Sequence, residues 1–482
     1  MEGPEASIPL NCMDKGFFAL HSKDEPMIIH CILTIDGAVD TVRLKSALST
    51  VLLRHPSLRS TMHSGLLRQV REATGNYGSD ILSVRDLVLP QDLADADRRQ
   101  IGAWYERRLS EWLNTPLDLG KELPCRVLLL RKTLKESSLV FTCHHSAADG
   151  LHCLRFIGEV IQAYNDATEN SSPSTCSLTN GKGDELVALA QAWRLRVRHF
   201  YLRMVASLAH RFLLAPLSPN ARICRTRSRP SAEVHFCQGS LNPHEVGQIR
   251  SRSKAVGATL NDALLAVCFR TVEQWNDAHG QPSRKISIMV PVDISSPSPS
   301  PVTANQASII SVSTTRKERT DPDELLRKVS QKRSHMVKNG IAFSVVYAAY
   351  FCSLLPPRMH TVMARFLMAT QIYLDSILLT NLGLIWPRGT ATVQGDNVGN
   401  ARITSVVVLP PVVSPMGISL CTGTYRDHLH IALEYKTAGF SKAEARTFLN
   451  LYLHELRSYQ RTPEGLLMPE VRYRDTRDAV SV

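Results

Sequence analysis

The residues best suited to chemistry are two adjacent histidines, His144 and His145, which are followed by Asp149 and Gly150. A neutral imidazole titrates near neutral pH, so it can take the proton of an alcohol or amine that attacks a thioester. We therefore predict that His145 is a general base for acyl transfer. Asp149 either orients this imidazole or pairs with an arginine and locks the loop, and the sequence leaves both roles open. Gly150 is expected to allow a sharp backbone turn.

A strand and a helix are expected to position these residues. Residues 139–143 are a short run of apolar, β-prone residues, which predicts a buried strand that ends at the histidines. Apolar residues then recur at three- and four-residue steps between Leu151 and Tyr164, which predicts a helix with one buried face. The histidines thus belong to a loop where a strand passes into a helix.

The pattern HHxxxDG resembles the motif of the condensation-domain and CoA-dependent acyltransferase superfamily. Other segments resemble elements of the same family, in the same order along the chain. They are RHPSLRST at residues 54–61, GATLNDALL at 257–265, VPVD at 290–293, Asn305, and TNLG at 380–383. The resemblance covers most of the chain.

This resemblance implies an α/β fold in which two chloramphenicol-acetyltransferase-like lobes form a pseudo-dimeric sandwich with a tunnel between them. It implies that His145 is the catalytic base and that Asp149 is mainly structural, with Arg59 as a candidate partner. His144 and Gly150 are then motif residues that support the loop. No metal and no permanently bound cofactor is implied: acyl-CoA or acyl-phosphopantetheine enters as a cosubstrate, and a monomer is expected.

Several family elements are missing from the sequence. The DFGWG element of plant-type acyltransferases is absent, and so are the later motifs of peptide-assembly condensation domains. No carrier or adenylation module accompanies the motif. We therefore expect a stand-alone acyltransferase rather than an assembly-line domain.

Composition is consistent with two lobes and reduced thiols. The 482 residues, 44% of them hydrophobic, are enough to bury large cores. The eleven cysteines form no CxxC pair, and an odd number argues against a complete disulfide framework. Cys143 is expected to pack rather than to act as a nucleophile. The first residues do not resemble a signal peptide and the apolar run at 343–355 is too short for a bilayer, so we expect a soluble cytoplasmic protein.

The formal net charge of +12 favours anionic partners, such as CoA phosphates or an acidic carrier protein. Arginines concentrate between residues 194 and 229, where they are mixed with apolar residues. This segment is either a basic connector whose arginine stems cover apolar surface, which we favour, or an amphipathic helix that makes peripheral membrane contact. No nucleic-acid-binding motif accompanies the charge, so we expect no nucleic-acid partner.

Residues 170–183 are rich in Asn, Ser, Pro and Gly, which predicts a boundary. The expected organisation is an N-terminal lobe over 1–180 that carries HHxxxDG, a basic connector over 181–231, and a C-terminal lobe over 232–482. The predicted elements of the C-terminal lobe are strands at 232–236, 286–292, 405–409, 417–425 and 430–435, helices at 259–275 and 441–456, and a Ser-Pro loop at 295–301.

Other chemistries lack their usual motifs. The sequence contains no GxSxG, GxxxxGK[ST], GxGxxG or HExxH pattern. His428 and His430 share one face of a predicted strand, but no third metal ligand is close in sequence, so we expect exposed strand residues there. Asn381 either hydrogen-bonds substrate or a developing oxyanion, or is only a turn residue before Leu-Gly, and both readings stay open.

We therefore predict an acyltransferase that moves an acyl group from a CoA or carrier-protein thioester to a hydroxyl or amine of a small molecule. The product is an ester or amide of secondary or lipid metabolism. The alternative is a non-catalytic condensation-like module that recruits a carrier protein or tailoring enzyme. The complete motif favours the enzyme, because a binding scaffold gives no reason to keep a base.

Overall fold

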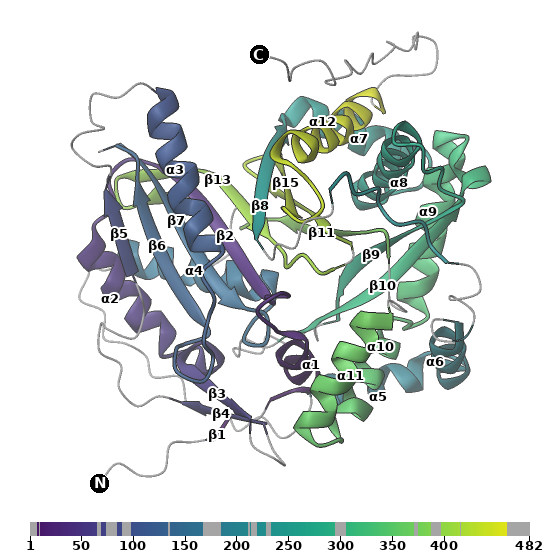
Figure 1. Cartoon of the computed structure of the whole chain (residues 1–482), viewed down its shortest axis with the longest axis horizontal. Helices are drawn as coiled ribbons and strands as arrows, with labels where there is room; N and C mark the ends of the chain where they lie inside the picture. Colours follow the sequence, from purple (N-terminus) through teal and green to yellow (C-terminus); the bar gives the residue numbers. More distant parts are fainter. Residues whose placement is uncertain are drawn as a thin grey trace, which may run out of the picture.

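Two mixed six-stranded sheets form the frame of the molecule, as the computed structural model shows (Figure 1). Each sheet carries its own helices, which gives two lobes that face one another. The structure describes residues 7–8, 10–64, 69–73, 84–88, 98–133, 135–166, 185–210, 213, 219–227, 233–294, 305–370, 375–386, 397–414 and 416–459. The predicted boundary at 170–183 and the Ser-Pro loop at 295–301 lie outside these ranges.

The sheet of the first lobe has the strand order β12-β13-β2-β7-β6-β5. In that order the strands are Asn397–Val398, Ala401–Leu409, Ile28–Asp36, Glu136–His144, Cys125–Arg131 and Val84–Val88. The first two come from the C-terminal half of the chain, and β13 pairs antiparallel with β2. The sequence-based division at residue 232 assigns them to the other lobe. Because β2 is buried over most of its length, its free edge needs such a partner.

Helices cover both faces of this first sheet. Helices α2 (Thr41–Leu52) and α4 (Gly150–Asp166) share one apolar core with alternate residues of β2. The intervening residues of the sheet form a second core with α3 (Arg98–Leu113). This alternation follows from the two-residue period of a strand. Beside the lobe lies a small three-stranded sheet of β1 (Ser7–Ile8), β4 (Gln69–Ala73) and β3 (Ser60–Ser64).

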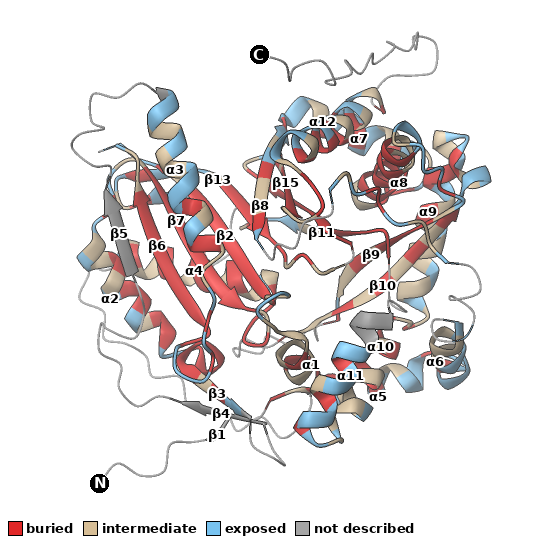
Figure 2. Ribbon diagram, in the orientation of Figure 1, coloured by how far each residue is buried: buried red, intermediate tan, exposed pale blue. Residues whose placement is uncertain are grey.

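The sheet of the second lobe has the order β10-β9-β11-β14-β15-β8. In that order the strands are Ala307–Thr315, Lys285–Asp293, Ile377–Leu384, Ile418–Tyr425, His428–Lys436 and Val234–Leu241. Helices α7 (Pro243–Ala255), α8 (Leu260–Ala278), α9 (Pro322–Lys338) and α12 (Lys442–Ser458) pack on it over one large core, which is coloured as buried in Figure 2. Thr259 caps α8 in a capping box with Asp262.

Five further helices lie along the lower side of the molecule in Figure 1. They are α1 (Cys12–Leu20), α5 (Glu185–Arg196), α6 (Phe200–Ala209), α10 (Phe343–Ser353) and α11 (Pro357–Thr370). Although α1 is first in the chain, it packs on α10 and α11. The described part of the basic connector forms two helices rather than one, because His199 takes a left-handed conformation with φ 60° between them.

The described residues contain no single helix that is long and apolar enough to cross a membrane. One bent pair, α7 with α8, passes that test by length and composition together. Most of α8 is buried in the core of the second lobe. The short apolar helix α10 matches the apolar run of the sequence.

Candidate active site

The two histidines lie where β7 ends, and α4 begins at Gly150, as the sequence predicts. Two backbone hydrogen bonds fix this end of the strand. The amide of His144 donates to the carbonyl of Pro124 at 2.7 Å, and that of His145 donates to the carbonyl of Met27 at 2.8 Å. The loop therefore leaves a firmly paired strand.

The ring of His145 is oriented by the other lobe. Its Nδ1 lies 3.0 Å from Oδ1 of Asn305, and Nδ2 of Asn305 donates to Oδ1 of Asp14 at 2.8 Å. A carboxylate only accepts hydrogen bonds, so the amide nitrogen faces Asp14 and the amide oxygen faces the imidazole. Nδ1 of His145 therefore carries the proton. Nε2 is left with a lone pair, which is the state a general base requires.

Helix α1 supplies the rest of this support. Asn11 caps the helix in a reciprocal capping box with Asp14, so the buried carboxylate of Asp14 holds both the helix end and Asn305. One turn later, Phe17 stacks on the ring of His145, with centroids 3.8 Å apart and planes at 15°. The imidazole is thus fixed by hydrogen bonding at its edge and by an aromatic ring on its face.

His144 lies in the interior of the protein. It is fully buried, and its Nδ1 accepts a hydrogen bond from the amide of Ser146 at 3.1 Å. The ring also meets the edge of His21, with centroids 4.6 Å apart. These contacts shape the loop from inside the protein.

Asp149 does not contact the ring of His145. Its Oδ1 accepts hydrogen bonds from the backbone nitrogen of His152 at 3.0 Å and from its Nδ1 at 2.7 Å, and its Oδ2 accepts from the amide of Gln306 at 3.0 Å. The partner of Asp149 is His152, which follows it by one helical turn, and not the predicted Arg59. Asp149 therefore locks the loop, and the imidazole is oriented by Asn305.

Charge pairing in this loop is reflected in both pKa values. Burial alone would raise the pKa of the Asp149 carboxyl, but the hydrogen bonds from His152 and Gln306 hold that pKa below its usual value. Burial alone would lower the pKa of His152, but Asp149 holds it above the ordinary 6.5. Both shifts favour the ion pair.

Gly150 does not have the positive φ that a sharp glycine turn would show. It is the first residue of α4, and a Cβ there would lie 3.4 Å from Cδ2 of Leu382. The expected conformational reason for this glycine is therefore wrong. Its surroundings show instead that β11 of the second lobe approaches the start of α4 closely.

A cavity of about 440 Å³ opens beside His145. Both lobes line it, and its walls are mostly apolar. The lining includes His145, Asp149 and Gly150 from the loop, Phe17 from α1, residues of β9, β10 and β11, and side chains of α10 and α11. A base with a free lone pair beside an apolar cavity of this size suits a substrate with a long apolar part.

The comparisons with known proteins agree with this geometry. The model of the condensation-domain family matches residues 5–281, more than half of the chain. The chain belongs to the condensation-domain family. The first condensation domain of the CDA synthetase superposes with a TM-score of 0.69 over 94% of this chain and 96% of that chain, at 14% identity. The expected pseudo-dimeric, chloramphenicol-acetyltransferase-like fold is confirmed.

Two other relatives are informative. A starter condensation domain of rhizomide synthetase, crystallised with C8-CoA and Leu-SNAC, superposes with a TM-score of 0.64 over 94% of each chain, at 12% identity. The isonitrile lipopeptide synthase of Mycobacterium tuberculosis (strain ATCC 25618 / H37Rv) is 28% identical over 182 residues. That match covers 36% of this chain and 7% of the synthase, so the chain corresponds to a small part of that relative.

Asn381 of this condensation-domain chain is a turn residue that also lines the cavity. Its Oδ1 accepts a hydrogen bond from the amide of Gly383 at 3.0 Å, and Gly383 has φ 69°. Its Nδ2 lies 3.4 Å from Oδ1 of Asn261. The turn role is observed, and contact with substrate or an oxyanion stays a prediction.

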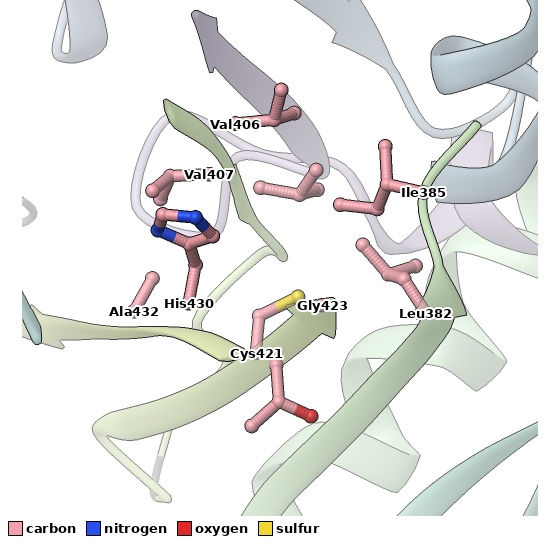
Figure 3. Close-up of a pocket in the computed structure, with 10 residues that line it drawn as sticks. Leu382, Ile385, Val406, Val407, Cys421, Gly423, His430 and Ala432 are labelled. Carbon is pink, nitrogen blue, oxygen red and sulfur yellow. The ribbon is translucent and has the colours of Figure 1, made fainter. Parts of the chain in front are cut away.

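The HxH pair does not form a metal site. His428 is exposed, whereas His430 is partly buried in a small pocket between the sheets, beside Val407 and Ala432 (Figure 3). Its expected full exposure is therefore wrong, and burial lowers its pKa to about 4. Within the described ranges, no three His, Cys, Asp or Glu side chains are grouped as metal ligands. Cys143 is fully buried in the core of the first lobe, which confirms its packing role.

Three residues of the site were not predicted as such from the sequence. In the sequence, Asn305 stands out only as a family-like element. Asp14 and Phe17 belong to a helix that the sequence does not place beside His145. The available signal for Asp14 was its place three residues after Asn11, which is the spacing of a capping box. Nothing local connects that helix end to a histidine more than a hundred residues away.

Proposed function

We propose that this condensation-domain protein transfers an acyl group from the thioester of CoA or of a carrier-bound phosphopantetheine to a hydroxyl or amine of a small molecule. The observation that carries the proposal is the state of His145. Asn305 engages its Nδ1, so the lone pair of Nε2 is the one available at the cavity. That is the group an incoming nucleophile needs.

The reaction follows from this one base. Nε2 of His145 takes the proton of the acceptor hydroxyl or amine as its oxygen or nitrogen attacks the thioester carbonyl. The tetrahedral oxyanion then collapses, the carbon–sulfur bond breaks, and the imidazolium returns the proton to the leaving thiolate. The side-chain amide of Asn305 keeps the ring in place through both steps: its Oδ1 accepts from Nδ1 of His145, and its Nδ2 donates to the backbone carbonyl of His145. No covalent enzyme intermediate is needed.

The choice of donor is supported by two relatives. One solved starter condensation domain carries C8-CoA, and one curated relative is a lipopeptide synthase. The apolar walls of the cavity are suited to an acyl chain. We propose acyl thioesters with an aliphatic chain as the donor class, with the thioester acting as a cosubstrate rather than a resident cofactor.

The experiment is to measure free thiol release from a panel of acyl-CoAs and acyl-carrier thioesters, each with a mixed pool of alcohols and amines. We expect His145→Ala to lower acceptor-dependent release by a factor of about a hundred to ten thousand. His428→Ala is the matched control, because His428 is exposed on β15 and does not line the cavity. Near-full turnover of His145→Ala would overturn the mechanism. No release from any donor by the wild-type protein would favour the recruiting module.

A further inference from the structure

Helix α11 exposes its apolar stripe to solvent. Met359, Val362, Met363 and Phe366 are spaced at i, i+3, i+4 and i+7, so they share one face of the helix. In an ordinary surface helix this face would be turned to the core. Here Val362 is 68% exposed and Phe366 is 55% exposed, while the opposite side of the helix, at His360 and Ala364, is buried.

Two neighbouring helices extend this surface. Phe351 and Leu354 at the end of α10 are exposed, and so are Tyr201, Leu202 and Val205 on α6. Helix α10 contacts both α6 and α11, and the three helices lie together at one end of the molecule (Figure 1, Figure 2). We refer to the exposed apolar residues of α6, α10 and α11 as the helical patch. Large apolar side chains exposed on neighbouring helices are typical of an interaction site.

The charged side chains on the helices of the patch and on the end of α5 are basic. Arg358 and Arg365 are exposed on α11, and Arg196 and Arg198 are exposed at and just after the end of α5. The sequence contains no Asp or Glu over residues 186–210 or 343–370. None of these four arginines forms an ion pair with another residue that the structure describes. These four arginines therefore add positive charge beside the patch that no described acidic residue pairs with.

The helical patch is continuous with the wall of the cavity. His360, Met363 and Ala364 of α11, together with Leu208 of α6, line the same cavity as His145. Because Met363 belongs both to the patch and to the wall of the cavity, an apolar molecule held at the patch would lie beside the cavity.

We infer that the helical patch docks on an anionic lipid bilayer. Helices with Phe, Leu and Met on one side and arginine beside them are suited to the interface of a membrane, and each arginine is attracted by anionic headgroups. A transient protein–protein interface is on average no more apolar than the remaining surface, so bulky apolar side chains on three helices fit a bilayer better. Docking of the patch on a bilayer does not depend on the proposed reaction, because docking requires no thioester.

The experiment is co-flotation of the full chain with vesicles of phosphatidylcholine alone or mixed with phosphatidylglycerol. The wild-type protein is expected to bind the anionic vesicles more tightly. Arg358→Gln with Arg365→Gln should weaken that binding about thirtyfold, or about 2 kcal/mol. Val362→Ser with Phe366→Ser should weaken binding to both kinds of vesicle, by about tenfold or more. Neither pair of residues lines the cavity.

Matched controls come from other surfaces of the molecule. Val42 is 79% exposed on α2, and Arg250 is exposed on α7, so Val42→Ser and Arg250→Gln should leave vesicle binding unchanged. Equal flotation of the wild-type protein and both patch variants would overturn the inference, as would no flotation at all. Loss of binding to an acidic carrier protein, with vesicle binding unaltered, would also overturn it and assign the patch to that protein.

Discussion

Two strand–loop–helix units of this molecule are built alike but use their loops differently. In the first lobe, the nine-residue β7 passes through residues 145–149 into the 17-residue α4. In the second, the nine-residue β15 passes through residues 437–441 into the 17-residue α12. Ser441 caps α12 in a box with Glu444, three residues away. The loop at 145–149 instead reaches across to the other lobe.

The difference lies in the residue that caps each helix. A serine hydroxyl serves the local cap at α12. At α4, one carboxylate caps the helix, holds the ring of His152 and accepts the amide of Gln306 from the other lobe. Only a group with two acceptor oxygens can serve all three. Since Asn305 holds His145, the loop is clamped to two consecutive residues of the second lobe, which ties the position of the candidate base to the contact between lobes.

The largest loss of stability should come from Asp149→Ala. It removes the cap and leaves His152 and Gln306 without their partner, and breaking a buried pair in this way costs about 3–5 kcal/mol. Asp149→Asn keeps an amide oxygen that can cap, so its loss should be smaller. Denaturant unfolding measures both variants. Equal stability of Asp149→Ala and the wild-type protein would remove the contrast between the two loops.

Asn305→Ala tests the second link to the other lobe. Without an acceptor at Nδ1, the His145 ring loses its fixed tautomer and orientation, and we expect kcat to fall about ten- to a hundredfold with KM little changed. The pH profile of kcat should also shift, which a purely structural defect would not cause. Asn381→Ala is a comparison variant for a turn amide at the same cavity. An unaltered kcat and pH profile in Asn305→Ala would contradict the positioning role.

Ser441→Ala measures the local cap of the other unit. Loss of an N-cap hydroxyl typically costs about 1 kcal/mol, so the free energy of unfolding should fall by about that amount. Turnover should not change, because Ser441 does not line the cavity. A loss as large as that of Asp149→Ala would show that the two caps carry equal weight.

The smallest effect should be the pH dependence of the pair in the first loop. Because Asp149 raises the pKa of His152, the stability from this pair is complete below pH 6.5 and is lost as the pH rises through the raised value. Because the pKa of Asp149 is lowered, the same stability is lost in acid only below pH 3.8. The deficit of His152→Gln against the wild-type protein should therefore shrink above pH 6.5. The deficit of Ser441→Ala should stay constant there.

Local elements were predictable from the sequence because their signals are local. β7, α4, α8 and α12 follow from the apolar pattern of their own segments. The candidate base followed from the motif and from the family resemblance. In each case the evidence lies within about twenty residues of the feature.

The remainder depends on contacts between distant parts of the chain. Asn305 is 160 residues from His145 and 291 residues from Asp14, so no spacing rule connects them. Whether Asp149 pairs with His152 or with Arg59 is decided by packing, which the sequence does not show. The pairing of β13 with β2 likewise joins segments whose apolar patterns would suit many partners.

The exchange of β12 and β13 into the first sheet also bears on how the protein can be divided. A fragment that stops at the connector would leave the edge of β2 bare along residues 30–36, and a bare, largely buried edge is a template for aggregation. The complementary C-terminal fragment would carry β13, which has an apolar face, without its partner β2. Expression of either half alone should give inclusion bodies, while co-expression of the two offers a route to a split protein in which the C-terminal half donates β12 and β13 to the first sheet.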